Sequence, residues 1–299
     1  MPLLRFMKKP EERKVRLLQV EVAESAGFCF GVKRAVDMVY KEAKKADNVY
    51  TYGPIIHNET VVDDLRQKGV QVIETPDDLE KLNEGTVIIR SHGVEEKLYQ
   101  ILEQKNIHVV DATCPFVKKI HQIVKEESEK GRRIVIIGNA KHPEVEGIKG
   151  WCKEDAVVIE SCKEAENIDF LPGEKLCIVS QTTFNYKNFE DIVEILSKKS
   201  YDILAMNTIC NATEKRQTEA AKLAARSEAM LVIGGKHSSN TQKLYEICKR
   251  ECKDTYHIQT LDDLDLNLFK SFRSVGITAG ASTPNNIIEE VQSYVRVEQ

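Results

Sequence analysis

The chain has 299 residues, of which 41% are hydrophobic and 30% are charged, and its formal net charge at pH 7 is −4. This composition is too apolar for disorder, the negative charge argues against nucleic-acid binding driven by overall charge, and no apolar run reaches the roughly 18–20 residues of a membrane span. Because a secretory signal is also absent, we expect a cytoplasmic protein of two or three small domains, with a basic N-terminal extension over residues 1–20.

Three segments share one design, in which an apolar β-type run leads into a small-residue turn with a cysteine and then into a helical pattern. They contain Cys29, Cys114 and Cys210 and read VEVAESAGFCFGVKRAVDMVYKEA, IHVVDATCPFVKKIHQIVKEES and YDILAMNTICNATEKRQTEAAKLA. Since Pro115 favours the first helical position, Cys114 is predicted to be an N-cap, with the other two cysteines in comparable turns. The helix dipole is therefore expected to lower the pKa values of the three thiols.

Each cysteine segment is followed by a second strand–turn–helix unit whose turn carries a histidine. These units read VYTYGPIIHNETVVDDL, RIVIIGNAKHPEVEGI and AMLVIGGKHSSNTQKLYEIC, and each histidine lies 27 or 28 positions after its cysteine. A third unit follows in each case: GTVIIRSHGVEEKLYQIL, KLCIVSQTTFNYKNFEDIVEIL and SVGITAGASTPNNIIEEVQSYV. The chain therefore contains nine such units in a threefold repeat.

Short apolar runs that alternate with helical patterns predict βαβ units with buried parallel strands. We expect an α/β fold of three similar domains related by pseudo-threefold symmetry, each a parallel sheet flanked by helices. Their expected ranges are 21–113, 114–209 and 210–282, with a C-terminal helix or tail over 283–299. Because ligands lie at the carboxyl ends of the strands in such sheets, the turns are predicted to face one central cavity.

Three converging cysteines without a fourth repeat-matched partner leave two kinds of metal site open. One is zinc held by three cysteines and a water, and the other is an iron–sulfur cluster in which one iron lacks a cysteine ligand. The other five cysteines do not share this repeat position: Cys152, Cys162, Cys177, Cys248 and Cys252. Cys248 and Cys252, four residues apart on one helical pattern, are expected to be ordinary helix neighbours without a ligand role.

Several turns carry residues that suit a bound anion, because backbone N–H groups and the dipole at a helix N-terminus favour phosphate. Imidazoles add donors that are neutral or charged near pH 7. We therefore predict a site for a diphosphate or similar anion at His57, His92, His142, Ser238, Ser239, Asn240 and Ser282. Beside it, Pro143 opens a helix whose first turn is predicted to point Glu144 into the cavity and Glu146 away from it, so that Glu144 can move protons.

Nine motifs in order along the chain resemble those of the LytB/IspH family of 4-hydroxy-3-methylbut-2-enyl diphosphate reductases. They are AGFCFGVKRAV, GPIIHN, RSHGV, DATCP, HPEVEG, SQTT, NTICNAT, SSN and TAGAS, and they span about residues 21 to 283. The resemblance implies reductive removal of the substrate hydroxyl, which gives isopentenyl and dimethylallyl diphosphate in the last step of the methylerythritol phosphate pathway.

The resemblance also implies specific roles for residues. One [4Fe–4S] cluster per chain would be held by Cys29, Cys114 and Cys210, with the fourth iron open to substrate. Glu144 would donate protons, and Thr182 would bind at the hydroxyl end and act in catalysis together with Glu144 and His142. The seven residues of the predicted anion site would hold the diphosphate.

Two alternatives stay open from the residues alone. One is an enzyme of the quinolinate-synthase type, in which the open iron is a Lewis acid without net redox, and the other is a non-catalytic iron–sulfur or zinc-binding sensor. A requirement for an external reductant would distinguish the reductase from the first alternative. A complete diphosphate site argues against the second, because a sensor would not need one. The resemblance implies a ferredoxin or flavodoxin as electron donor, for which Lys33/Arg34 or Lys118/Lys119 form a candidate docking patch.

Overall fold

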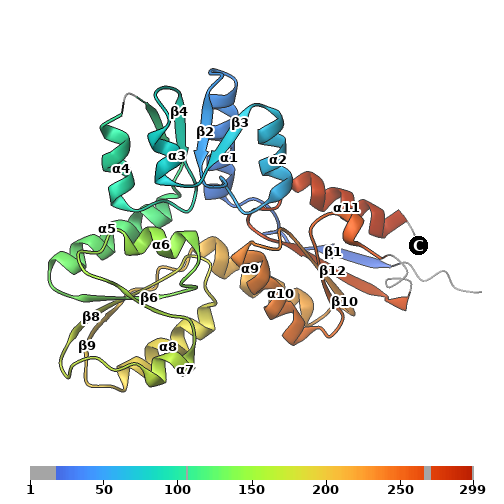
Figure 1. Ribbon diagram of the computed structural model, residues 1–299. Coiled ribbons are helices and arrows are strands. Elements are labelled where there is room, and N and C mark those ends of the chain that lie inside the picture. The colour runs from blue at the N-terminus through green and yellow to red at the C-terminus, as the bar shows by residue number, and fades with distance from the viewer. Residues whose placement is uncertain (1–17, 106, 266–270, 298–299) are drawn as a thin grey trace, which may run out of the picture.

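Apolar strands buried along their whole length, such as Thr86–Ile89 and Ala229–Ile233, organise the chain, as expected of parallel sheets covered by helices on both faces. The computed structural model describes residues 18–105, 107–265 and 271–297, so all but the last three residues of the expected N-terminal extension lie outside it. Three units surround a common centre, each with one four-stranded sheet whose strand pairs are all parallel (Figure 1). The expected α/β class with three similar domains is confirmed.

The first unit contains the sheet β3-β2-β4-β5. Apolar clusters on its two faces centre on Ile88 and Ile89, whose side chains point to opposite faces. Its strands are β2 (Val49–Tyr52), β3 (Val70–Ile73), β4 (Thr86–Ile89) and β5 (His108–Asp111), and its helices are α1 (Phe30–Ala43), α2 (Glu59–Gln67), α3 (Pro76–Glu80) and α4 (Glu96–Glu103).

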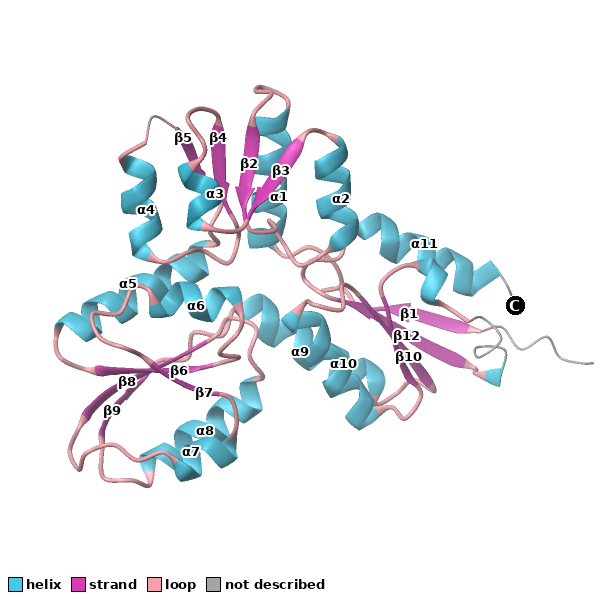
Figure 2. Ribbon diagram, viewed as in Figure 1, coloured by secondary structure: helices cyan, strands magenta, loops and turns pink. Residues whose placement is uncertain are grey.

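The second unit repeats this order as β7-β6-β8-β9. Helices lie on both faces of this sheet (Figure 2), and an apolar cluster packs on each face. Its strands are β6 (Arg133–Ile137), β7 (Val157–Ile159), β8 (Lys175–Ser180) and β9 (Asp202–Ala205), and its helices are α5 (Pro115–Glu129), α6 (Pro143–Lys149), α7 (Cys162–Asn167) and α8 (Tyr186–Ser197).

The third unit has the same order only because β1, the first strand of the described residues, completes it as β11-β10-β12-β1. Apolar residues of α11, including Val291 and Val295, pack on this sheet, so the expected C-terminal helix or tail is part of this unit. Its strands are β1 (Gln19–Val22), β10 (Ala229–Ile233), β11 (Thr255–Ile258) and β12 (Ser274–Ala279), and its helices are α9 (Asn211–Ala224), α10 (Ser239–Glu251), the short 3₁₀ helix η1 (Leu261–Asp263) and α11 (Asn285–Val297).

The position of β1 differs from the prediction, which placed the strand before Cys29 in the first domain. β1 instead pairs in parallel with β12, with Val22 opposite Ile277. A four-residue strand does not specify its partner by its own sequence, so this pairing was not readable from the pattern. In each unit the edge strand that completes the sheet leads directly into a cysteine turn. Within the described residues, no helix has the length and apolarity needed to cross a membrane.

Candidate active site

Three cysteines occupy equivalent positions at the start of the helix that follows each edge strand. Cys29 is the N-cap of α1, Cys114 of α5 and Cys210 of α9, which confirms the N-cap position expected for Cys114. None of the three side chains makes a cap hydrogen bond. Each sulfur therefore remains available as a ligand, while the helix start fixes its position.

The three cysteines line one pocket together with Glu144 and Thr182. A Cβ on Gly31 would lie 2.5 Å from Cys114 Sγ, so only a glycine in α1 leaves this sulfur its room. The donor set of three sulfurs in one largely apolar pocket fits an iron–sulfur cluster with one iron unligated by cysteine. The pocket is lined by Cys29, Gly31, Val32, Ser91, His92, Cys114, Phe116, Val117, Glu144, Thr182, Thr183, Cys210, Ala212, Thr213 and Ala281.

The expectation that the helix dipole lowers the thiol pKa values is wrong for two of the three cysteines in the polypeptide alone. Burial raises the pKa of Cys114 to about 11, despite backbone N–H groups of Phe116 and Val117 that lower it. Burial likewise raises the pKa of Cys210. Desolvation outweighs the helix terminus here, so a bound cation is needed to hold these sulfurs as thiolates.

A buried guanidinium lies behind the pocket, at Arg216 in α9, and the sequence reasoning missed it. The side chain is 3% exposed and donates to Ala279 O at 2.8 Å and to Gly27 O at 2.9 Å. Burial lowers its pKa, whereas negative charge on Cys29, Glu219 or Cys210 raises it. Arg216 therefore joins the turns of the third unit and places a positive charge near two cysteines. Nothing in the sequence around Arg216 distinguishes it from an ordinary arginine on the surface of a helix, so its burial was not predictable.

Three histidines from two units form a second cluster next to the cysteine pocket. The ring centroids of His57 and His92 lie 4.6 Å apart, and His142 lies 5.3 Å from His92 and 5.5 Å from His57. Burial lowers the pKa of all three rings, that of His142 to about 3, and the charge of Arg90 adds to the effect. The rings are therefore neutral at pH 7 in the polypeptide alone.

The unpaired nitrogens of this cluster show where a ligand would bind. His142 Nδ1 accepts from the Glu144 backbone N–H at 3.1 Å, which leaves Nε2 as its donor. His57 Nε2 and His92 Nδ1 are buried without a hydrogen-bond partner, as is Nε of the neighbouring Arg90. Because buried polar groups without partners are costly, these atoms indicate a polar ligand.

Arg90 is a second residue that the sequence reasoning missed. It follows β4 directly, and Gly53, at φ +70°, approaches it so closely that a Cβ would lie 2.1 Å from Arg90 Nη1. A half-buried cation, whose Nε is fully buried, beside three neutral histidines favours an anionic ligand.

Hydroxyl and amide groups of the third unit extend the histidine cluster. Ser282 Oγ donates to His57 O at 3.2 Å and lies 3.3 Å from Ser238 Oγ, and Ser238 caps α10 by accepting from Thr241 N. Asn240 Oδ1 accepts from Ala281 N, while Asn240 Nδ2 is buried without a partner.

Ser239 connects the third unit to the second through hydrogen bonds of its side chain. Its hydroxyl accepts from Thr183 Oγ1 at 3.1 Å and from Gln181 Nε2 at 3.4 Å. Ring contacts and hydrogen bonds therefore link the three histidines, Ser282 and Ser238 into one network. Ser239 lines a pocket with His57 and His142, and Asn240 follows it in the first turn of α10, so the structure brings all seven residues predicted for the anion together.

Nitrogen ligand atoms of His57, His92 and His142 lie within 4.8 Å of one another, so the three rings could hold a metal ion as well as an anion. Two features favour an anion. The charge of the half-buried Arg90 repels a second cation, and the adjoining N-terminus of α10 attracts negative charge.

Glu144 lies between the two clusters. It is 1% exposed and accepts from Thr182 N at 2.6 Å and from Thr182 Oγ1 at 2.7 Å. Burial raises its pKa to about 7, although the two hydrogen bonds from Thr182 lower it. Glu146, by contrast, is exposed and pairs with Lys149 at 3.2 Å, so the two carboxylates face as predicted.

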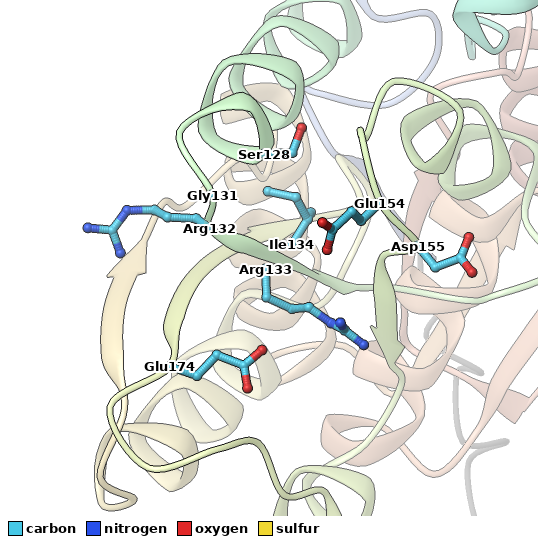
Figure 3. A pocket seen from close by; sticks show the side chains of 8 residues that line it. All are labelled: Ser128, Gly131, Arg132, Arg133, Ile134, Glu154, Asp155 and Glu174. Carbon is cyan, nitrogen blue, oxygen red and sulfur yellow. The ribbon is translucent and has the colours of Figure 1, made fainter.

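The remaining cysteines do not line the cysteine pocket. Cys248 and Cys252 pack in an apolar cluster of the third unit, and Cys177 packs in one of the second. A separate pocket lies around the amino end of β6, away from the cysteine turns, where charged side chains surround Ile134 (Figure 3). Arg132, at its rim, is paired with Glu127 and Asp202, so we place no site there.

Comparison with known proteins identifies relatives over nearly the whole chain. Residues 20–296 match the family model described as LytB protein. A 4-hydroxy-3-methylbut-2-enyl diphosphate reductase from Caldanaerobacter subterraneus subsp. tengcongensis is 53% identical over 282 residues, which cover 93% of this chain and 97% of the relative. The enzyme of the same name from Clostridioides difficile is 46% identical over 279 residues, which cover 93% of this chain and 99% of the relative.

Two solved structures share the fold. The E-1-hydroxy-2-methyl-but-2-enyl-4-diphosphate reductase from Plasmodium falciparum superimposes with a TM-score of 0.87 at 28% identity, covering 93% of this chain and 88% of the other. A structure of (E)-4-hydroxy-3-methyl-but-2-enyl diphosphate reductase, described as the terminal enzyme of the non-mevalonate pathway, gives a TM-score of 0.67 at 41% identity. It covers 94% of this chain and 99% of the other.

Proposed function

Because this chain belongs to the LytB protein family, we propose that it reductively removes the hydroxyl group of (E)-4-hydroxy-3-methylbut-2-enyl diphosphate, giving isopentenyl and dimethylallyl diphosphate. The observation that carries this proposal is the direct adjacency of two sites. A pocket with three N-cap cysteines and a buried acid adjoins a network of unpaired donors suited to diphosphate. The family membership favours this reaction over the quinolinate-synthase type and over a sensor.

The proposed cofactor is one [4Fe–4S] cluster held by Cys29, Cys114 and Cys210. When bound, it supplies electrons one at a time and an iron without a protein ligand. The chain contributes three helix starts that hold the sulfurs at fixed positions, and Gly31 gives Cys114 Sγ its space. Arg216 adds a buried positive charge that favours the anionic form of the ligands.

The proposed diphosphate site is the histidine–serine network. His57, His92 and His142 offer ring N–H groups, and Ser238, Ser239, Asn240 and Ser282 offer hydroxyl, amide and helix-terminal donors. Charge-assisted hydrogen bonds of this kind are about twice as strong as neutral ones. With the diphosphate held there, the other end of the substrate extends into the pocket that Glu144 and Thr182 line.

Glu144 is the proposed proton donor. Its pKa of about 7 means that its carboxyl carries a proton in a large fraction of molecules at neutral pH. Thr182 holds the two carboxyl oxygens through its N–H and hydroxyl groups, which fixes the direction in which the proton is offered. His142 is the third proposed catalytic residue, because its Nδ1 orients the backbone of Glu144.

The proposed electron donor is an acidic ferredoxin or flavodoxin. Phe30 and Phe116 are 70% and 43% exposed and lie one and two residues after Cys29 and Cys114, so an apolar contact surface adjoins the cysteine pocket. Of the basic residues nearby, Arg34 binds backbone carbonyls and Lys118 pairs with Asp111.

Lys33 and Lys119 are the remaining exposed cations of this patch. The variant Lys33→Glu/Lys119→Glu should therefore slow turnover with reduced ferredoxin or flavodoxin but not with dithionite and methyl viologen. An equal loss with both kinds of reductant, or no loss, would contradict this docking surface.

The reaction itself is tested with protein purified and reconstituted without oxygen. We expect about four irons per chain, a brown colour, and reductant-dependent conversion of the hydroxylated diphosphate to both products. Stoichiometric zinc in place of iron, or turnover without reductant, would overturn the proposed function.

A further inference from the structure

Trp151, the single tryptophan of the chain, lies at the contact between the first and second units. It follows α6, the helix that carries Glu144. Its Nε1 donates to Val94 O of the first unit at 2.8 Å. A second bond crosses the same contact, from Glu96 N to Gly150 O at 3.4 Å.

Aromatic rings hold the indole of Trp151 in place. His121 of α5 stacks on it with ring centroids 5.0 Å apart and an interplanar angle of 17°, and Tyr99 of α4 meets it edge-on at 5.7 Å. The ammonium of Lys125 lies 5.8 Å from the ring centroid and forms an ion pair with Glu96 at 2.5 Å. The contact therefore combines stacking, a cation and a directed hydrogen bond on one side chain.

The loop from Arg90 to Val94, which carries His92, has one anchor from each unit. Within the first unit, Ser91 Oγ donates to Ile55 O at 3.0 Å. From the second unit, the Trp151 indole holds Val94 O. His92 lies between these two anchors, so its position depends on both.

His121 touches the same loop from the other side. A Cβ on Gly93 would lie 2.6 Å from His121 Cε1, so the ring packs directly on the glycine next to His92. His121 is 3% exposed and its Nε2 has no hydrogen-bond partner. α5 also begins at Cys114, whose N–H donates to Ser91 O at 2.9 Å, so the helix that carries His121 meets the loop at two points.

We propose that Trp151 and His121 are positioning residues that fix the His92 loop against the second unit and so set the distance between His92 and His142 in the diphosphate site. This inference rests on the proposed function and deepens it. It assigns affinity for the diphosphate group to a contact that does not touch the substrate. Removing the contact should therefore change binding more than the chemical step.

The test compares four variants of the reconstituted holoenzyme by calorimetric titration with inorganic pyrophosphate and by steady-state kinetics. Trp151→Phe keeps a ring but loses the donor, and it should weaken pyrophosphate binding and raise KM about 2- to 10-fold, with kcat and iron content unchanged. His121→Ala should do the same, and His121→Phe should restore wild-type binding because it retains the stack. Tyr201→Phe is the matched control, since it removes a hydrogen bond between a ring and a backbone group, to Phe170 N, inside the second unit.

A structural readout separates positioning from general stability. With 5-fluorotryptophan the chain gives a single indole fluorine resonance, and pyrophosphate should shift it in the wild type but not in His92→Ala. Unchanged pyrophosphate affinity in Trp151→Phe, an equal loss in Tyr201→Phe, or a resonance unmoved by saturating pyrophosphate would each overturn the positioning role. Failure of wild-type holoenzyme to bind pyrophosphate would instead overturn the diphosphate site itself, and this inference with it.

Discussion

Replacing Glu144 by glutamine should make the enzyme slower and more stable at once. The amide keeps the size of the side chain, can accept from Thr182 N and can donate to Thr182 Oγ1, but it has no proton to give. Loss of a general acid lowers kcat by about 10²–10⁴-fold. Because Glu144 is not part of the histidine–serine network, pyrophosphate affinity should stay within about twofold of wild type, well below the cost of a lost hydrogen bond to a charged group.

The gain in stability follows from the pKa of Glu144. Burial raises this pKa from 4.5 in the unfolded chain to about 7 in the folded one. At pH 7 the folded carboxyl is roughly half protonated, whereas the unfolded one is almost fully ionised, so the buried acid costs about 3 kcal/mol. Glutamine removes that cost, and Tm should rise by about 5 °C. Any weakening of the hydrogen bonds from Thr182 would reduce this gain.

The sign of the pH dependence is fixed by the direction of the shift. A carboxyl whose pKa is raised on folding destabilises the protein above its unfolded pKa. The advantage of Glu144→Gln should therefore be absent below pH 4.5, grow between pH 4.5 and 7, and stay constant above pH 7. The kcat of the wild type should fall as pH rises through about 7, as the acid loses its proton.

The assays are anaerobic thermal unfolding across pH and single-turnover kinetics, with Glu146→Gln as the control. Glu146 is exposed, and the same change there should alter neither rate nor stability beyond the small effect of its ion pair with Lys149. The reasoning would be refuted by a Glu144→Gln enzyme that keeps more than about a tenth of its kcat. A Tm lower than that of the wild type at pH 8 would refute the burial cost.

Three further outcomes test the site. Cys114→Ser should lose most of its iron in a colorimetric assay, whereas Cys248→Ser, which alters only an apolar cluster, should retain it; full iron in the first variant would remove Cys114 from the ligands. Asn240→Ala removes a buried amide donor and should weaken pyrophosphate binding by about 1–3 kcal/mol in calorimetry, with iron content unchanged. EDTA should leave pyrophosphate affinity unaltered if the three histidines bind the anion directly, and a loss of affinity would show that they hold a metal ion.

Much of the site was predictable because its chemistry is tied to local backbone features. A cysteine between an apolar strand and the following helical pattern lies at the carboxyl end of that strand. Three cysteines at the same repeat position therefore converge in a threefold arrangement. Glu144 and Glu146 were separable for a similar reason, since two residues along a helix turn the side chain by about 200°.

The features that the sequence did not reveal depend on distant contacts. Arg216 reads as an ordinary polar helix residue, and only the approach of Gly27 and Ala279 makes it a buried cation. Arg90 becomes part of the site only through the approach of Gly53. The thiol pKa of Cys114 was misjudged because the dipole is local, whereas burial is set by all three units.

The pairing of β1 with β12 has a consequence for how the enzyme is made. β1 leaves the ribosome about 250 residues before its partner β12, and contacts of such separation form slowly. The backbone N–H of Cys29 also donates to Ala281 O, just after β12, so Cys29 reaches its final place only when β12 has been made. The first two sheets can form before β12 has been made, but the third cannot. Cluster insertion should therefore wait until β12 has been made, and a ribosome-bound chain stalled before residue 274 should contain Cys29, Cys114 and Cys210 and yet fail to hold iron.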